Sequence, residues 1–139
     1  MHLSRILFPV LLVLALVACG GDGSTPAGPT DPARASHNAG RDCLQCHNFT
    51  LAGTVYRDDG STYPGAVVRI TSQAEDGGEV LVNVTTDASG NFYTSTPVGW
   101  DDGLYTDVQG TGVLRSMGTS VPSGACNSCH AGADRIHAD

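Results

Sequence analysis

Two copies of the motif Cys-x-x-Cys-His carry the clearest chemistry in this sequence. One occupies residues 43–47 (CLQCH) and the other residues 126–130 (CNSCH). This spacing is typical of covalent haem attachment, in which two thiols add to the vinyl groups of one haem and the following histidine binds the iron as its proximal ligand. The sequence therefore predicts two c-type haems. The cysteines that would carry them are Cys43, Cys46, Cys126 and Cys129.

Histidines in and beside the motifs supply the expected axial iron ligands. The chain has five histidines, one of which lies in the hydrophobic leader. The motifs define His47 and His130 as proximal ligands. The other two, His37 and His137, lie in short polar segments, and we expect them to be the distal ligands of two six-coordinate haems, each serving its own motif or the other one. Met117 is a thioether competitor that would raise the potential of one haem, but its strand pattern favours a role in the core or at a sheet edge.

Paired cysteines have other uses in proteins, and two of them stay open here. Two Cys-x-x-Cys pairs can build a tetrahedral zinc site, although zinc does not need a histidine directly after each pair. Structural disulfides or redox-active dithiols are the other alternative. Four of the five cysteines lie in the motifs, and the fifth, Cys19, closes the leader.

The first 18 residues have the pattern of a signal peptide. A start containing Arg5 precedes an apolar run over residues 6–17 that is too short to span a bilayer. The run ends in residues 16–19 (LVAC), which resemble the lipobox of bacterial lipoproteins. This resemblance implies lipidation of Cys19 and, with Gly20 after it, sorting to the outer membrane. An ordinary cleaved signal is the alternative, and export is expected in both cases.

The rest of the chain divides by composition. Residues 19–36 are rich in Gly, Pro, Ser and Thr and cannot bury a core, so we expect a disordered tether. A haem-binding segment at 37–50, a β-domain at 51–121 and a second haem-binding segment at 122–139 follow. The roughly 100 residues beyond the tether suffice for one small domain, which excludes a large enzyme.

The charge balance limits the partners. The chain has 14 acidic residues against seven arginines and no lysine, a formal net charge of −7 that becomes −8 once the leader with Arg5 is removed. Nucleic acids and anionic lipid surfaces are therefore poor partners. An acidic surface favours basic patches on redox proteins, or metal cations, and membrane attachment is expected through lipid only.

Between the motifs, apolar and polar residues alternate and turn residues interrupt the pattern at short intervals. No stretch has a helical stripe. Residues 59–60 (DG) and 89–91 (SGN) are turn signals, because Gly and Asn tolerate positive φ. The pattern favours an all-β fold, an antiparallel β-sandwich. The expected strands cover residues 51–57, 66–72, 80–86, 91–96, 104–109 and 112–117.

Three segments of this region carry a family resemblance. Residues 53–56 (GTVY), 64–70 (PGAVVRI) and 86–92 (TDASGNF) follow one another in an order that resembles the carboxypeptidase-regulatory-like module of exported proteins. The resemblance implies an Ig/transthyretin-like sandwich, flanked here by the two haem-binding segments. It also implies a spacer or binding scaffold without chemistry of its own, and fold alone supplies no function.

Taken together, these features resemble small dihaem c-type cytochrome lipoproteins and the multihaem electron carriers of metal-respiring bacteria. The resemblance implies outer-sphere electron transfer with redox proteins or extracellular acceptors, in the periplasm or at the cell surface, and no enzymatic activity. One alternative is a small dihaem peroxidase or haem sensor, which needs an open iron position. Another is a surface binding or adhesion module with structural cysteines. An odd number of strands would put the haem segments at opposite ends of the sandwich and favour head-to-tail stacking into a filament.

Overall fold

The computed structural model describes residues 38–75 and 77–139. The leader, the tether, Cys19 and His37 therefore lie outside the described residues, and the predictions made for them stay predictions. Within the described ranges, no helix has the length and apolar character needed to cross a membrane.

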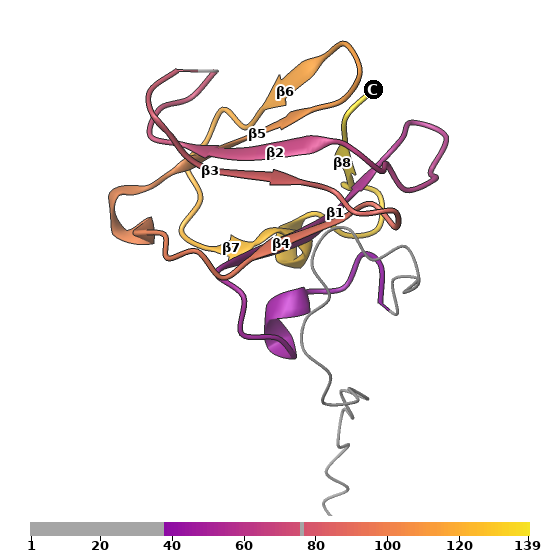
Figure 1. The fold of residues 1–139 in the computed structure, drawn as a ribbon, viewed down its shortest axis with the longest axis horizontal. Coiled ribbons are helices and arrows are strands. Elements are labelled where there is room, and N and C mark those ends of the chain that lie inside the picture. Colours follow the sequence, from indigo (N-terminus) through magenta and orange to yellow (C-terminus); the bar gives the residue numbers. More distant parts are fainter. Residues whose placement is uncertain (1–37, 76) are drawn as a thin grey trace, which may run out of the picture.

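Two β-sheets pack face to face in two layers (Figure 1). The first sheet has the order β4-β1-β7, and β8 pairs with the other end of β1. Its strands are β1 (Leu51–Tyr56), β4 (Asn91–Thr94), β7 (Gly124–Ala125) and β8 (Ile136–His137). The second sheet has the order β3-β2-β5-β6. Its strands are β2 (Val67–Thr71), β3 (Val80–Thr85), β5 (Tyr105–Gln109) and β6 (Leu114–Ser116).

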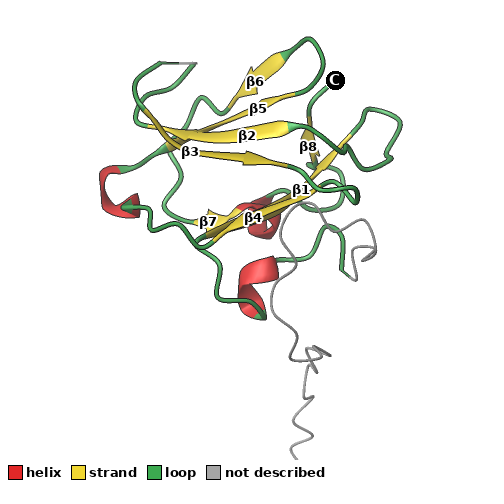
Figure 2. Ribbon diagram, in the orientation of Figure 1, coloured by secondary structure: helices red, strands yellow, loops and turns green. Residues whose placement is uncertain are grey.

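Helical structure in the described part is confined to single turns (Figure 2). They are η1 (Cys43–Gln45), η2 (Trp100–Asp102) and α1 (Cys126–Cys129). Both η1 and α1 consist of residues from the two Cys-x-x-Cys-His motifs, and both lie beside the first sheet (Figure 1). The two candidate haem segments are therefore the main departures from the β-sandwich.

The core lies between the sheets because every second residue of the strands is apolar. Leu51, Val55 and Phe92 point inward from the first sheet, and Val68 and Ile70 from the second, and all five are buried. Burial of a side chain of this size stabilises the fold by about 1.5–3 kcal/mol. On its other face the second sheet holds the ion pair of Arg69 and Asp107 at 3.1 Å.

The predicted all-β sandwich is confirmed, and so are its six expected strands, which are one or more residues shorter than expected. The expected turn at residues 89–91 is present too, with Gly90 at φ 75°. There the Asp87 carboxylate accepts hydrogen bonds from the backbone N–H groups of Ser89 at 2.8 Å and Asn91 at 2.9 Å.

The last segment of the chain differs from the expected simple flank. It contributes β7 and β8, which pair in parallel with the two ends of β1. Each of these strands has only two residues, and such a short stretch shows no periodicity that sequence analysis could detect. The C-terminal haem segment is thus built into the first sheet.

Candidate haem sites

The two motifs fold into similar closed turns. The backbone N–H of His47 donates to the carbonyl of Cys43 at 2.9 Å, and that of His130 donates to Cys126 at 2.9 Å. Residues three and four apart lie on the same face of a helical turn. In the second motif, Cys126, Cys129 and His130 all line one hollow, as attachment of one haem requires.

Both turns are positioned by strand β1. The edge of β1 pairs with β7 at residues 51–52 and with β8 at residues 55–56. Between these pairings the backbone N–H of Thr54 donates to Oδ1 of Asn127 at 3.0 Å. Asn127, the second residue of α1, is 3% exposed. Its side chain thus takes the place of a strand partner in the middle of β1.

Asn127 also reaches the first motif. Its Nδ2 donates to the backbone carbonyl of Arg41 at 2.9 Å and to Oγ1 of Thr54 at 3.2 Å. Arg41 lies two residues before Cys43. The condition for separated haem segments, an odd number of strands, is not met in the described residues, which form eight strands. β7 and β8 return the C-terminal segment to β1, where the N-terminal segment also packs.

The first motif lies on an aromatic row. The imidazole of His47 stacks on Phe49 with ring centroids 5.2 Å apart, and Phe49 stacks on Tyr93 of β4 at 4.8 Å. Burial raises the pKa of the Cys43 thiol, and the nearby Asp42 carboxylate raises it further.

The first cysteine of the second motif faces the inside of the sandwich. Cys126 packs against the core, and burial raises the pKa of its thiol to about 12, with the charge of Cys43 as the next cause. This places the first cysteines of the two motifs close together. The close approach of Cys126 to β1 depends on Gly53. An added Cβ at this position would lie 2.5 Å from the ring of Phe92 and 3.1 Å from Cβ of Cys126.

Two adjoining hollows of about 240 and 190 Å³ open beside Cys126. Thr106, Met117, Cys126 and His130 line both of them. Each volume is below the roughly 300–1,000 Å³ of typical small-molecule sites. These hollows could therefore take only part of a haem that Cys126 and Cys129 would hold.

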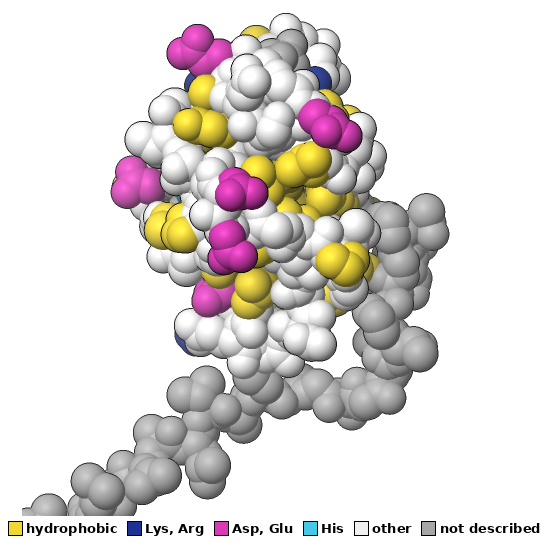
Figure 3. Space-filling model, turned by 90° about the vertical axis from the view of Figure 1, so that its left-hand side faces the viewer, with side chains coloured by type: hydrophobic (Ala, Val, Ile, Leu, Met, Phe, Trp, Pro, Cys, Tyr) yellow, Lys and Arg dark blue, Asp and Glu magenta, His cyan; other side chains and the backbone are white. Residues whose placement is uncertain are grey.

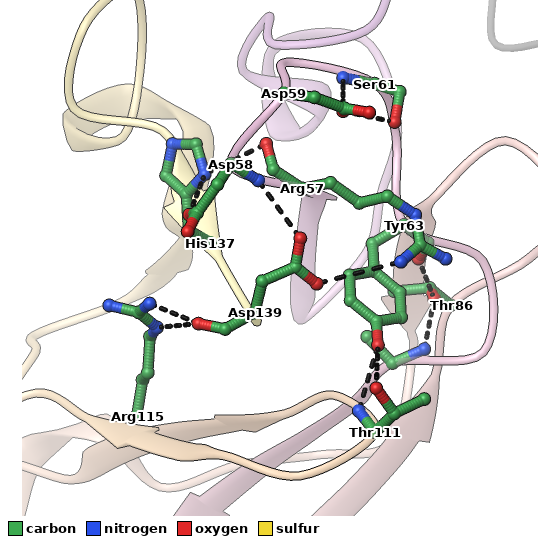
Figure 4. Close-up of polar contacts among 11 residues, drawn as sticks. Arg57, Asp58, Asp59, Ser61, Tyr63, Thr86, Thr111, Arg115, His137 and Asp139 are labelled. Carbon is green, nitrogen blue, oxygen red and sulfur yellow. Dashed lines mark hydrogen bonds and ion pairs between the residues drawn. The ribbon is translucent and has the colours of Figure 1, made fainter.

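The histidines of the second segment are oriented for metal binding. Nδ1 of His130 lies 2.8 Å from the carbonyl oxygen of Asp134. Nδ1 of His137 lies 3.1 Å from the carbonyl oxygen of Arg57 and 3.5 Å from the Asp58 carboxylate. In Figure 4 the other ring nitrogen of His137 points away from both partners. A histidine whose Nδ1 bonds to a carbonyl presents Nε2 as a metal ligand, and both histidines line the larger hollow.

The end of β8 is fixed around His137. The Asp139 carboxylate accepts a hydrogen bond from the backbone N–H of Asp58 at 3.1 Å and pairs with Arg57 at 3.7 Å, and Arg115 donates to the Asp139 backbone carbonyl (Figure 4). The structure therefore brings two of the predicted iron ligands, His130 and His137, to one hollow. His37 lies outside the described residues.

Met117, which was expected in the core or at a sheet edge, follows the edge strand β6 and lines both hollows, with its sulfur accepting a hydrogen bond from Thr106 at 3.1 Å. One functional candidate, Asn127, escaped sequence analysis. Asn127 occupies one of the two variable positions of its motif, so the motif itself gives no signal for it. Only the packing of α1 against β1 shows what Asn127 does.

Comparison of the chain with family models, curated proteins and solved structures finds no match. The resemblances drawn from the sequence therefore stay predictions. Among residues 38–75 and 77–139, no three His, Cys, Asp or Glu side chains gather closely enough to hold a metal ion by themselves.

Proposed function

We propose that this protein is a dihaem c-type cytochrome that transfers electrons by an outer-sphere mechanism. The observation that carries the proposal is the similar closed turn of the two Cys-x-x-Cys-His motifs, each closed by a histidine N–H bond of 2.9 Å to the first cysteine. A zinc site or a disulfide framework does not require a histidine directly after each of two cysteine pairs.

The cysteines and histidines have defined roles in this proposal. Cys43 and Cys46 hold one haem and Cys126 and Cys129 the other, while His47 and His130 bind the two irons. His137 is proposed as a distal ligand, because its Nε2 remains available and its ring lines the same hollow as His130, and His37 as the other. When bound, each haem supplies one electron position that alternates between ferric and ferrous iron. Two imidazoles per iron favour low potentials.

The surface charge sets the class of partner. The face in Figure 3 carries acidic side chains around a group of hydrophobic ones, and basic side chains are scarce on it. Such a surface attracts basic patches of redox proteins or cationic acceptors and repels nucleic acid. With the signal peptide and Cys19, we propose export and lipid anchoring at the outer membrane, on its periplasmic face or at the cell surface.

The packing of Cys126 against the core favours a second candidate, a surface binding module in which the cysteines are structural. A haem peroxidase or sensor is the third candidate, and it needs one open iron position. The proposed cytochrome has none, because both axial positions of each iron are taken by histidine.

One preparation distinguishes the three. The full chain is produced in a bacterium with a cytochrome maturation system, its haem content is measured as the pyridine haemochrome, and the reduced protein is exposed to carbon monoxide. The cytochrome predicts two haems per chain and no carbon monoxide uptake. One equivalent of uptake would favour the peroxidase or sensor, and a chain without haem would favour the binding module.

A further inference from the structure

We infer that Asn127 joins the two haem segments so that the two haems form one close pair that exchanges electrons within a single molecule. This inference rests on the proposed function, since it needs both haems to be attached. Asn127 acts as a positioning residue, because it contacts the segments that carry the haems and not the haems themselves.

The first support is the hydrogen bonding of a buried amide. Asn127 lies between Cys126 and Cys129, and its side-chain amide bonds both to β1 and to the chain before the first motif. Oδ1 accepts from Thr54 of β1 at 3.0 Å, and Nδ2 donates to the carbonyl of Arg41 at 2.9 Å. Because the side chain is 3% exposed, water cannot readily replace these partners, and losing them would leave buried groups unsatisfied.

The second support is a shared anchor on β1. Oγ1 of Thr54 accepts from Nδ2 of Asn127 at 3.2 Å and from the backbone N–H of Gly40 at 3.4 Å, and it donates to Asn91 of β4 at 3.0 Å. Thr54 is itself buried. The chain before the first motif, the chain of the second motif and two strands therefore meet at one pair of side chains.

The third support is the position of the thiols. Cys43 lies close enough to Cys126 for its charge to act on the Cys126 thiol, and the absence of a side chain at Gly53 lets Cys126 approach β1. Each of these cysteines would bond to the edge of its own haem. The two haems would therefore be attached at neighbouring thiols beside β1.

The consequence is a redox interaction between the haems. With both haems attached, an electron lost by the ferrous iron of one haem would be gained by the ferric iron of the other, so that oxidation and reduction balance and the total charge is unchanged. Because the protein interior screens charge weakly, reduction of one haem makes reduction of its neighbour harder. The pair then titrates in two separated one-electron steps, as other interacting sites do.

Circular dichroism in the Soret band and a redox titration of the holoprotein test the pairing. Two haems in close contact give a couplet of opposite-signed bands and two separated potentials. Asn127→Ala removes the link and is expected to lose most of the couplet and to bring the potentials together. Asn48→Ala is the matched control, because Asn48 is an exposed asparagine directly after the first motif, and it should keep both signals.

Asn127→Asp serves if Asn127→Ala does not fold, since a carboxylate still accepts from Thr54 but has no donor for Arg41. It is expected to lose the couplet as well. A natural protein that carries two haems without a couplet would overturn the inference, and so would variants at Asn127 that keep it. The proposed function fails separately, through a natural protein without two covalent haems.

Discussion

At the scale of single residues, the two motifs place their reactive groups in unequal surroundings. Cys126 lies against the core, whereas Cys129 and His130 are at the surface or partly exposed. The motif in the sequence identifies these groups and their order but gives no information about burial. Burial matters for chemistry, because only the thiolate form of a cysteine is a strong nucleophile.

The Cys126 thiol makes the stability of the haem-free protein depend on pH. Its pKa rises from the ordinary 9.0 to about 12 on folding, so between these values the folded chain keeps a proton that the unfolded chain releases. The free energy of unfolding should therefore be constant below this range and fall as the pH rises through it, by up to about 1.4 kcal/mol per pH unit. Urea unfolding at a series of alkaline pH values measures the slope. Cys126→Ser should show a shallower slope, and an unchanged slope in that variant would contradict the assignment.

His137 is expected to close the distal position of the second haem. Its removal in His137→Ala should open that position, so that the reduced holoprotein takes up one equivalent of carbon monoxide. Met117 lines the same hollow and provides the comparison. Met117→Leu should take up none and keep the potentials of the natural protein. Carbon monoxide uptake by Met117→Leu, together with a lowered potential, would instead identify Met117 as the ligand.

At the scale of elements, β1 organises the molecule. It is buried along its whole length and receives β4 on one side, and β7, Asn127 and β8 on the other. Sequence analysis predicted β1 and five further strands because alternating apolar residues reveal half-buried strands. It missed β7 and β8, whose pairing depends on residues far apart in the chain. For the same reason it could not show that the two motifs meet.

β1 and α1 approach closely at Gly53, and Gly53→Ala tests that contact. The added Cβ would lie 2.5 Å from the Phe92 ring and 3.1 Å from Cβ of Cys126, so the core or α1 must shift. Overpacking of this kind costs about 1–3 kcal/mol, and less haem should attach to the second motif. Thermal unfolding and haem content measure both effects. Gly112→Ala is the control, since no atom lies within 4 Å of its added Cβ; an equal loss there would refute the packing argument.

At the scale of the whole molecule, one β-sandwich places two candidate haem sites beside the same strand, β1. Composition predicted one small domain with an acidic surface, because domain size and net charge follow from residue counts. The relative position of the two haem segments did not follow, since the connection between them depends on one buried amide. The argument for stacking into a filament no longer holds, because the haem segments do not lie at opposite ends of the sandwich.

The acidic surface predicts how electron transfer responds to salt. The rate of reduction of a basic redox protein should fall by about tenfold from low to high ionic strength, because screening removes the attraction that speeds encounter. Stopped-flow spectroscopy measures the rate. A neutral small-molecule acceptor should show almost no change, and a rate that rises with salt for the basic partner would contradict the proposed steering.

The central claim is that each end of the described chain carries a covalent haem on its own Cys-x-x-Cys-His turn. The most direct measurement is the intact mass of the denatured protein after maturation, because thioether-bound haem survives unfolding and loosely bound haem does not. The account predicts the mass of the processed chain plus two haems, falling by one haem when both cysteines of either motif are replaced by alanine. A processed chain that carries no added haem mass would contradict it.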